Sequence, residues 1–272
     1  MSEVDKSSGG ANTQDPFGFL KEFTNARIAL GRAGGSLPTQ AVLDFRMAHA
    51  RARDAVHLAF EAEDLGARLE ARGWPTVRVT SAAPDRRSFL QRPDLGRQLD
   101  KISSQRLAAL PGVAIGYNVV FVIGEGLSPL AVHRHALPLL EHVLPQLAAE
   151  GWCIAPFVVA SQARVALGDE VGSALSAFMV VMLIGERPGL SSPDSLGVYL
   201  TFDPRPGRMD SERNCLSNIR PEGMNYQFAA HKLLYLMRES RRRRISGVLL
   251  KDDAPPASLS EPYQGKLLPL GG

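Results

Sequence analysis

Four apolar runs in the second half of the chain constrain its fold most strongly. They cover residues 119–123, 153–160, 178–184 and 196–202. Each is rich in β-branched or bulky residues and is bounded by turn-forming residues, as buried strands are. Helical sequence lies between the first three runs. Strands that alternate with helices predict an α/β fold: a Rossmann-like, mostly parallel sheet that is covered on both faces.

The loop after the third run is unusually dense in special residues. Gly185, Glu186, Arg187, Pro188 and Gly189 follow one another, so a charged pair stands directly at the end of an expected central strand. Glycine permits a positive φ or a close backbone approach, and proline fixes φ. Two interpretations remain open from the residues alone, a binding loop or an ordered structural turn. A third role for Glu186, general base, lacks any partner acid or nucleophile that the sequence can place beside it.

Several polar loops are expected to meet at one edge of the sheet. Ligands of open α/β sheets bind at the carboxyl ends of the strands. The sequences GEGLS, SQARV and GERPGL follow the first three runs, so they lie at those ends. The sequence NCLSNIRPEG, residues 214–223, is predicted to be a loop in front of the last helix, at 225–243. Because helix N-termini face the same edge, we expect this loop to join the other three.

The rest of the chain is predicted to be mainly helical before residue 111. The expected organisation is a disordered tail at 1–15, a mainly helical region at 16–110 and an α/β domain at 111–272. Within these segments we expect a short helix around Phe17, Leu20 and Phe23, one helix at 39–68, a half-exposed strand in WPTVRVTS, a helix with Pro93 in its first turn, a helix from Ser128 as N-cap to about 150, bent or split at Pro138 and Pro145, and a short helix at 169–176.

Composition excludes several classes of protein. The 272 residues carry 31 basic and 28 acidic side chains, a net charge of +3, which gives no general argument for nucleic-acid binding. The N-terminus lacks the apolar segment of a secretory signal, and no apolar run approaches the ~20 residues of a membrane helix. Two cysteines, Cys153 and Cys215, cannot form a disulfide framework and suit a reducing compartment. A soluble cytosolic protein is expected.

Known catalytic and metal-binding motifs are absent from the sequence. The GxGxxG fingerprint fails because Pro129 stands at the position of the third glycine, and no P-loop, nucleophile elbow or HExxH occurs. His133 and His135 are two residues apart, so they point to different faces of a helix. His49 and His57 are eight apart, too far for one metal ion. Structural histidines are the favoured interpretation, and no metal site is predicted.

Two further features allow two interpretations each. Cys215 is either a buried small apolar residue, which is favoured, or a reactive thiol. The run Arg241–Arg244 lies at the end of the last expected helix, where it complements the helix dipole. A solvated helix end is the default there, and a patch for phosphate or nucleic acid is the alternative.

A collinear set of motifs identifies a family resemblance. The sequences are ARIALGRAG, LPTQA, RPDLGR, GLS, ARV, LIGERPGLSSPDSL, RNCLSNI and ISGV, and they span roughly residues 24 to 248. In this set the chain resembles the small (light) subunit of ethanolamine ammonia-lyase. The blocks around GERPGL and CLSNI are long and specific. The first ~15 residues match nothing in particular, as is common for terminal tails.

The resemblance implies a complete enzyme of two kinds of subunit. Such an enzyme converts ethanolamine to acetaldehyde and ammonia, in ethanolamine degradation, with adenosylcobalamin as cofactor. The large subunit holds the substrate and the radical chemistry, and the small subunit closes over the cobalamin. The resemblance further implies a dodecamer of six large and six small subunits, without membrane or nucleic acid. It would be cytoplasmic, either free or enclosed in a bacterial microcompartment.

Carried over residue by residue, the cobalamin contacts of the family fall on Val165, Glu186 and Cys215. Val165 would contribute a backbone group, Glu186 would accept hydrogen bonds from the cofactor, and Cys215 would be a contact rather than a nucleophile. No catalytic acid, base or nucleophile is expected on this chain. Arg187 is a candidate for the cofactor's phosphate or for orienting Glu186.

The chain differs from the family pattern at one position and lacks one motif of other cobalamin-binding proteins. Glu125 stands in GEGLS where relatives often have Asp. The chain lacks the DxHxxG motif of proteins that ligate cobalt through a histidine, which agrees with the family. The leading rival is a stand-alone, transferase-like or small-molecule-binding α/β protein of unknown ligand. A weaker rival is a nucleic-acid module that uses Arg241–Arg244.

Overall fold

The computed structural model describes residues 15–24, 26–110 and 116–255. The predicted tail therefore lies outside the described residues, except for Asp15. The described chain forms one six-stranded sheet in the order β1-β3-β2-β4-β5-β6. The strands are β1 (Thr76–Thr80), β2 (Val120–Gly124), β3 (Phe157–Ser161), β4 (Met179–Gly185), β5 (Leu196–Phe202) and β6 (Arg213–Ile219).

The sheet is mixed but mostly parallel, which confirms the predicted α/β class. The first four strands in the order above are parallel to one another. β5 is antiparallel to β4, and β6 is antiparallel to β5, so β6 runs in the same direction as β4. The connection between β4 and β5 is only the 186–195 loop, which is too short for the crossover that a parallel pair requires.

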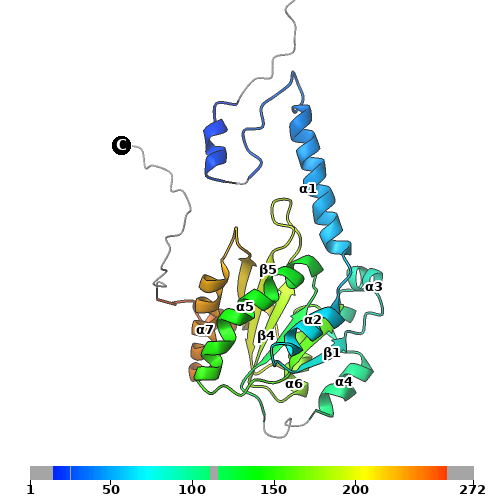
Figure 1. Cartoon of the computed structure of the whole chain (residues 1–272), viewed down its shortest axis with the longest axis vertical. Helices are drawn as coiled ribbons and strands as arrows, with labels where there is room; N and C mark the ends of the chain where they lie inside the picture. Colours follow the sequence, from blue (N-terminus) through cyan, green and yellow to red (C-terminus); the bar gives the residue numbers. More distant parts are fainter. Residues whose placement is uncertain (1–14, 25, 111–115, 256–272) are drawn as a thin grey trace, which may run out of the picture.

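Helices cover the sheet on both faces (Figure 1). On the first face, α2 packs on β1 and β3, α5 packs on β2, β4 and β5, and α7 packs on β5 and β6. On the second face, α4 packs on β1, and α6 packs on β2 and β4. The helices are α1 (Thr39–His57), α2 (Ala62–Glu70), α3 (Arg86–Gln91), α4 (Lys101–Ala108), α5 (Pro129–Ala149), α6 (Leu167–Ala174) and α7 (Tyr226–Arg243). Within the described ranges, 3₁₀ turns occur at Gly18–Glu22, Leu95–Arg97, Asp210–Glu212 and Gly247–Leu249.

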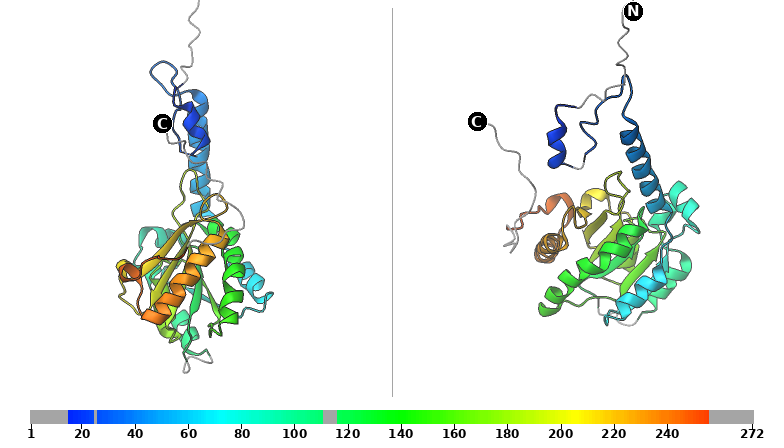
Figure 2. Two further views of the ribbon diagram at one scale, coloured as in Figure 1. Left: turned by 90° about the vertical axis from the view of Figure 1, so that its left-hand side faces the viewer. Right: turned by 45° about the horizontal axis from the view of Figure 1, so that its top comes forward.

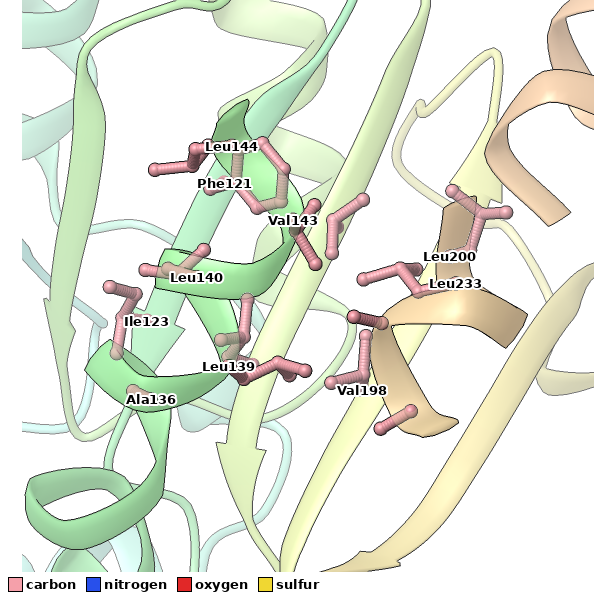
Figure 3. Packing of buried hydrophobic residues seen from close by; sticks show 14 of the residues in the cluster. Phe121, Ile123, Ala136, Leu139, Leu140, Val143, Leu144, Val198, Leu200 and Leu233 are labelled. Carbon is pink, nitrogen blue, oxygen red and sulfur yellow. The ribbon is translucent and has the colours of Figure 1, made fainter. Parts of the chain in front are cut away.

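The larger hydrophobic core lies on the first face. Every residue of β2 and β4 is buried, as expected for strands with helices on both sides. Figure 3 shows Leu140, Val143 and Leu144 of α5 over β2, and Leu233 of α7 beside Val198 and Leu200 of β5. A smaller cluster beneath α4 and α6 covers the second face. It reaches only as far as the half-buried Tyr199 on β5. Asp169 of α6 binds Arg213 at the start of β6, but no described helix covers the second face around Tyr199 and Cys215.

The prediction that NCLSNIRPEG is a loop is wrong for its first half. Residues 213–219 form β6, the edge strand of the sheet. Its outward residues are polar, and only Leu216 and Ile219 pack into the core. A bulge between these two residues breaks the two-residue alternation that marks a strand, so the sequence pattern did not show it.

Three helix predictions also need correction. The single helix expected at 39–68 is divided into α1 and α2, because Leu58 has extended backbone (φ −56°, ψ 138°) and the chain turns there to bury Leu65 and Leu69. Pro93 does not start a helix: the next α-helix, α4, begins at Lys101 and is capped by Asp100.

The third correction concerns α5, which runs through Pro138 and Pro145 without a break. Its predicted start is confirmed, since the Ser128 hydroxyl accepts a hydrogen bond from Ala131 N at 3.3 Å. The short segment around Phe17 is a 3₁₀ turn rather than an α-helix. β3 begins only at Phe157, after Pro156, which has no N–H to give to a strand.

An N-terminal arm, residues 15–57, extends away from the sheet. Figures 1 and 2 show α1 leaving the body of the molecule, with the preceding segment folded back beside it. Ala55 is the only buried residue of α1. By contrast, β1 pairs with β3, so the sheet includes a strand from the region before residue 111. Among the described residues, no helix combines the length and the apolarity needed to cross a membrane.

Candidate functional site

The polar loops do converge at one edge of the sheet. β2, β3, β4 and β6 all end there, and hydrogen bonds join their loops. Leu127 N donates to Gly185 O at 2.9 Å, and the Ser128 hydroxyl donates to Pro193 O at 2.8 Å. The loop at 214–223 reaches this edge because it continues a strand that is parallel to β4. The predicted convergence is therefore confirmed, and only the 214–223 segment joins it for a reason other than the predicted one.

Close backbone packing explains the glycines of GEGLS and GERPGL. A Cβ atom on Gly185 would lie 2.1 Å from Ser128 O and 2.6 Å from Glu125 O. Gly126 has φ +55°, and a Cβ atom there would lie 2.3 Å from Gly185 O. The two loops thus pack backbone against backbone, which only glycine permits. This contact fixes the direction in which the chain leaves β4 and enters Glu186.

Hydrogen-bond donors surround the carboxylate of Glu186. The Ser217 hydroxyl donates to Oε1 at 2.5 Å, Asn218 N donates to Oε2 at 3.2 Å, and the Ser195 hydroxyl also donates to Oε2. Arg187 is not among the donors that the described residues provide, so it does not orient Glu186. Since the surrounding groups are all donors, Glu186 is held as an acceptor.

The bulge in β6 and a glycine in β5 create the space for Glu186. Ser217 and Asn218 form the bulge, and Asn218 takes a left-handed conformation (φ 57°). This turns the Asn218 N–H and the Ser217 hydroxyl toward the carboxylate. Opposite them, a Cβ atom on Gly197 would lie 2.9 Å from Glu186 Oε1. Sequence reasoning did not place Ser195, Ser217 or Gly197 beside Glu186. The available signal for the bulge was an Asn inside a polar stretch, since Asn tolerates this conformation.

Cys215 lies beside Glu186 on the open part of the second face. It pairs with Tyr199 across the two strands and is exposed, so the favoured interpretation of a buried apolar cysteine is wrong. Partial desolvation by its neighbours raises the pKa of the Cys215 thiol, and the charge of Glu186 raises it further. Burial and the neighbouring thiol also raise the pKa of Tyr199. Both groups are therefore neutral at pH 7, which argues against a reactive thiolate.

Val165 lies on the loop that follows β3, on the same face of the sheet. It is half-buried against the smaller core cluster, which also contacts Tyr199. It lines a groove of about 600 Å³ between the 3₁₀ turn at Leu95–Arg97, the start of α6 and the 206–210 segment. Glu186 and Cys215 are thus adjacent, and Val165 borders a groove two strands away at the same edge.

A buried carboxyl group, Glu125, supports the loop after β3. Its two oxygens share the hydrogen bond from Gln162 N, at 2.7 and 2.8 Å, and Oε1 lies 3.8 Å from the guanidinium of Arg86. Only 1% of its surface is exposed, and this burial raises its pKa to about 7. Gln162 itself has φ +55°, an uncommon conformation that this hydrogen bond stabilises. Glu125 therefore holds the backbone just before Val165.

Histidine and arginine residues pin the far end of the 186–195 loop. Asp194 accepts a hydrogen bond from Arg134 at 2.8 Å and lies 3.3 Å from Nε2 of His135. The Nδ1 atom of His135 lies 2.7 Å from the hydroxyl of Tyr226. Burial lowers the pKa of His135. The structural interpretation of His135 is confirmed, and the described residues include no cluster of three potential metal ligands.

The arginine run at the end of α7 is mostly engaged within the chain. Arg241 lies over the ring of Trp152, 4.7 Å from its centre, and Arg242 binds Glu239. Arg244 adopts a left-handed conformation that ends the helix. These contacts agree with the interpretation of the arginine run as a helix end rather than as a patch for phosphate or nucleic acid.

Taken as a surface, this edge defines a class of protein. It offers an acceptor carboxylate, an exposed sheet face and an adjoining groove. The structure is therefore that of an α/β protein with an open, polar edge to its sheet.

Comparison with known proteins identifies the family within this class. The family model described as ethanolamine ammonia-lyase light chain matches residues 14–251. The chain is 58% identical over 246 residues to the ethanolamine ammonia-lyase small subunit of Ralstonia nicotianae, with 89% of this chain and 90% of the relative covered. It is 54% identical to that of Pseudomonas fluorescens Pf-5, with 94% of each covered, and 57% identical to that of Azotobacter vinelandii, with 91% and 92% covered. The chain belongs to the ethanolamine ammonia-lyase light-chain family.

Proposed function

We propose that this chain is the cobalamin-binding small subunit of an adenosylcobalamin-dependent ethanolamine ammonia-lyase. Val165, Glu186 and Cys215 contact the cofactor, at the interface with a large catalytic subunit. The observation that carries the proposal is the position of Glu186 and Cys215, which lie side by side on a sheet face without a covering helix. A surface that leaves its polar residues uncovered in this chain suits a large cofactor held between two subunits.

The residues at this edge fit the cofactor's chemistry. Cobalamin carries primary amides around its ring, and their N–H groups need acceptors. Glu186 is an acceptor in a fixed position, with Ser195 and Ser217 as further hydroxyl groups. Cys215 is neutral and small, so a flat ring can approach the strand there. When bound, adenosylcobalamin supplies a carbon radical by homolysis of its cobalt–carbon bond.

The role of this chain in the reaction is to bind and cover. It provides no catalytic acid, base or nucleophile in this proposal, and the large subunit binds ethanolamine and directs its conversion to acetaldehyde and ammonia. The protein acts in ethanolamine degradation as a dodecamer of six large and six small subunits. It works in the cytoplasm, either free or inside a bacterial microcompartment.

Co-expression with a large subunit tests the proposal. We expect a stable complex that takes up adenosylcobalamin and releases ammonia from ethanolamine. A Glu186→Gln variant should assemble normally but bind the cofactor about 10-fold or more weakly, because an amide brings a donor among the donors of Ser195 and Ser217. Glu141→Gln is a matched control and should bind the cofactor as the wild type does. Glu141 lies on α5, where its exposed side chain pairs with Arg72.

The stand-alone rival makes the opposite prediction. If the chain stays monomeric in the presence of the large subunit, and the mixture neither takes up cobalamin nor releases ammonia, the proposed function is wrong.

A further inference from the structure

Three arginines at the ligand edge lack a carboxylate partner within the described chain. They are Arg97, Arg164 and Arg187, from the segment after α3, the loop after β3 and the loop after β4. Their guanidinium groups are close enough for the charges of Arg97 and Arg187 to act on Arg164. Across the described residues, Arg97 and Arg187 form no side-chain hydrogen bond or ion pair. Like charges gathered in this way repel one another unless an anion joins them.

Arg164 is held in place as a fixed member of this group. Its backbone N–H donates to Gly96 O at 2.8 Å, and Nη2 donates to Phe89 O at 3.1 Å. Its guanidinium lies 4.2 Å from the centre of the Phe89 ring. A Cβ atom on Gly96 would lie 2.8 Å from Cγ of Arg164, so glycine leaves the room that this side chain occupies. The stacking and the hydrogen bonds order the side chain before anything binds.

Apart from the bond to Phe89 O, the hydrogen-bonding capacity of the Arg164 guanidinium is not used by the described residues. Its Nε is buried and has no partner among the described residues. Burial lowers the pKa of Arg164, and the charges of Arg86, Arg97 and Arg187 lower it further. The buried carboxyl group of Glu125 is already engaged by Gln162 and Arg86. An anion would remove this unfavourable electrostatic state.

The groove beside Val165 is where such an anion would lie. Arg97 and Arg164 line it together with Val165. The carboxylates on its other wall are engaged elsewhere: Asp169 forms two hydrogen bonds of 2.6 Å with Arg213, and Glu170 accepts one from Leu99 N. Asp210 is exposed and lies 3.5 Å from Arg213. Arg97 and Arg164 are thus arginines of this groove that have no carboxylate partner among the described residues.

We propose that Arg164, with Arg97 and Arg187, binds the phosphodiester of the nucleotide loop of cobalamin. This inference rests on the proposed function and adds an anion subsite to it. Cobalamin offers one negatively charged group, its phosphodiester, and guanidinium groups bind phosphate oxygens through pairs of parallel hydrogen bonds. Val165 and Arg164 are neighbours, so the backbone contact at Val165 and the phosphate contact at Arg164 belong to one segment.

A pair of corrinoids tests the subsite directly. Adenosylcobalamin has the phosphodiester, whereas adenosylcobinamide lacks the nucleotide loop. We would measure dissociation constants of both for the two-subunit complex by spectroscopic titration. Arg164→Gln should weaken adenosylcobalamin binding about 10- to 100-fold, the range of a charge-assisted hydrogen bond, and change adenosylcobinamide binding less than about 2-fold. Arg97→Gln and Arg187→Gln should give smaller losses of the same selective kind.

The controls separate this subsite from other roles. Arg68→Gln removes one positive charge from α2, on the opposite face, and should leave both constants unchanged. Millimolar inorganic phosphate should compete with adenosylcobalamin in the wild-type complex and lose that effect in Arg164→Gln. The competition experiment distinguishes two kinds of site. If the site binds the cofactor's phosphodiester, Arg164→Gln weakens adenosylcobalamin binding; if it binds free phosphate alone, Arg164→Gln leaves adenosylcobalamin affinity unchanged.

Three results would overturn the subsite. The first is an equal loss for both corrinoids in Arg164→Gln, and the second is no loss in any of the three variants. The third is weaker binding of the large subunit with unchanged corrinoid affinity, which would assign the arginines to carboxylates of the partner. Because Arg97 and Arg187 are exposed, their variants should fold even if Arg164→Gln does not. A wild-type complex that binds neither corrinoid would instead refute the proposed function, and the subsite with it.

Discussion

At the scale of single residues, Glu125 should make the protein's stability depend on pH. Burial raises its pKa to about 7 in the folded chain, from 4.5 for a glutamate in water. The folded state therefore holds a proton that the unfolded state releases between these values. This contribution to stability is fully present below about pH 4.5 and is lost as the pH rises through about 7.

The Glu125→Gln variant should remove this dependence. Between pH 5 and pH 8 the wild-type chain should lose stability, on the order of 1–3 kcal/mol from this group. The variant should lose correspondingly less, since its side chain cannot ionise. Thermal unfolding midpoints at the two pH values measure the difference, with the exposed Glu63→Gln as a control. An identical slope in wild type and Glu125→Gln would show that Glu125 does not titrate in this range.

Gly197 should matter for binding more than for folding. A Cβ atom there would lie 2.9 Å from Oε1 and 3.0 Å from Cγ of Glu186, the movable end of a long side chain. Gly197→Ala should therefore displace the carboxylate from Ser217 and Asn218 at little cost in stability. We expect about a 10-fold loss of adenosylcobalamin affinity in the two-subunit complex, from hydrogen bonds that Glu186 can no longer offer.

Gly18→Ala provides the matched control for this substitution. A Cβ atom on Gly18 meets no other atom within 4 Å. Its cofactor affinity should equal that of the wild type. Unchanged affinity in Gly197→Ala, together with an unchanged unfolding midpoint, would show that the position of Glu186 is not needed for binding.

At the scale of elements, two helix caps of similar chemistry should differ in function. Ser128 caps α5 by accepting from Ala131 N, and Asn225 caps α7 by accepting from Phe228 N at 2.9 Å. Replacing either by Ala should cost about 1 kcal/mol of stability. Only Ser128 also donates to Pro193 O, at 2.8 Å, and so ties α5 to the loop that carries Glu186.

Comparing the two variants separates stability from loop position. Ser128→Ala should reduce adenosylcobalamin affinity several-fold beyond any effect of Asn225→Ala, because the 186–195 loop loses one of its anchors. The measurements are chemical unfolding of the small subunit and corrinoid titration of the complex. Equal cofactor affinities in the two variants would mean that the bond from Ser128 to Pro193 does not hold the binding loop.

The elements that the sequence predicted well share one property: they are decided by local pattern. Buried strands such as β4 and β5 and the cap at Ser128 follow from composition and capping chemistry within a few residues. The division of α1 from α2 was not predictable in this way, because it depends on the distant core that receives Leu65 and Leu69. Likewise, β6 is a strand only because β5 provides the pairing edge.

The site shows the same limit. The sequence placed Glu186 at the end of a strand, and the family resemblance singled out Val165 and Cys215. The donors that orient Glu186 come from Ser195 and from the bulge of β6, and neither follows from the residues near Glu186 in the chain. Gly197 is adjacent to Glu186 only through the antiparallel pairing of β4 with β5. Such neighbours require the register of the strands, which local pattern does not contain.

At the scale of the whole molecule, the N-terminal arm is the least self-sufficient part. Residues 15–57 leave six large apolar side chains exposed by about half or more, from Phe17 to Met47. The arm lies near the ligand edge, since Arg27 donates to Leu190 O at 3.3 Å, within the 186–195 loop. A large subunit that covers the cofactor at this edge would also reach the arm. We therefore expect the arm to bind the large subunit.

Leu43 and Met47 allow this expectation to be tested without disturbing the fold. They are 52% and 55% exposed and stand one helical turn apart on α1. The double variant Leu43→Gln, Met47→Gln keeps good helix formers and should leave the unfolding midpoint of the small subunit unchanged. Burying the two half-exposed side chains is worth about 1.5–3 kcal/mol in total, so the dissociation constant for the large subunit should rise roughly 10- to 100-fold.

The control and the contrary outcomes follow from the position of the arm. Ile102→Gln changes a side chain that is 67% exposed on α4, remote from α1, and should leave subunit association unchanged. Sedimentation or light scattering of each variant with the large subunit measures the constants. Unaltered association in the double variant would exclude the arm as the docking element. Loss of self-association of the isolated small subunit, with the mixed complex intact, would show instead that the arm joins two copies of this chain.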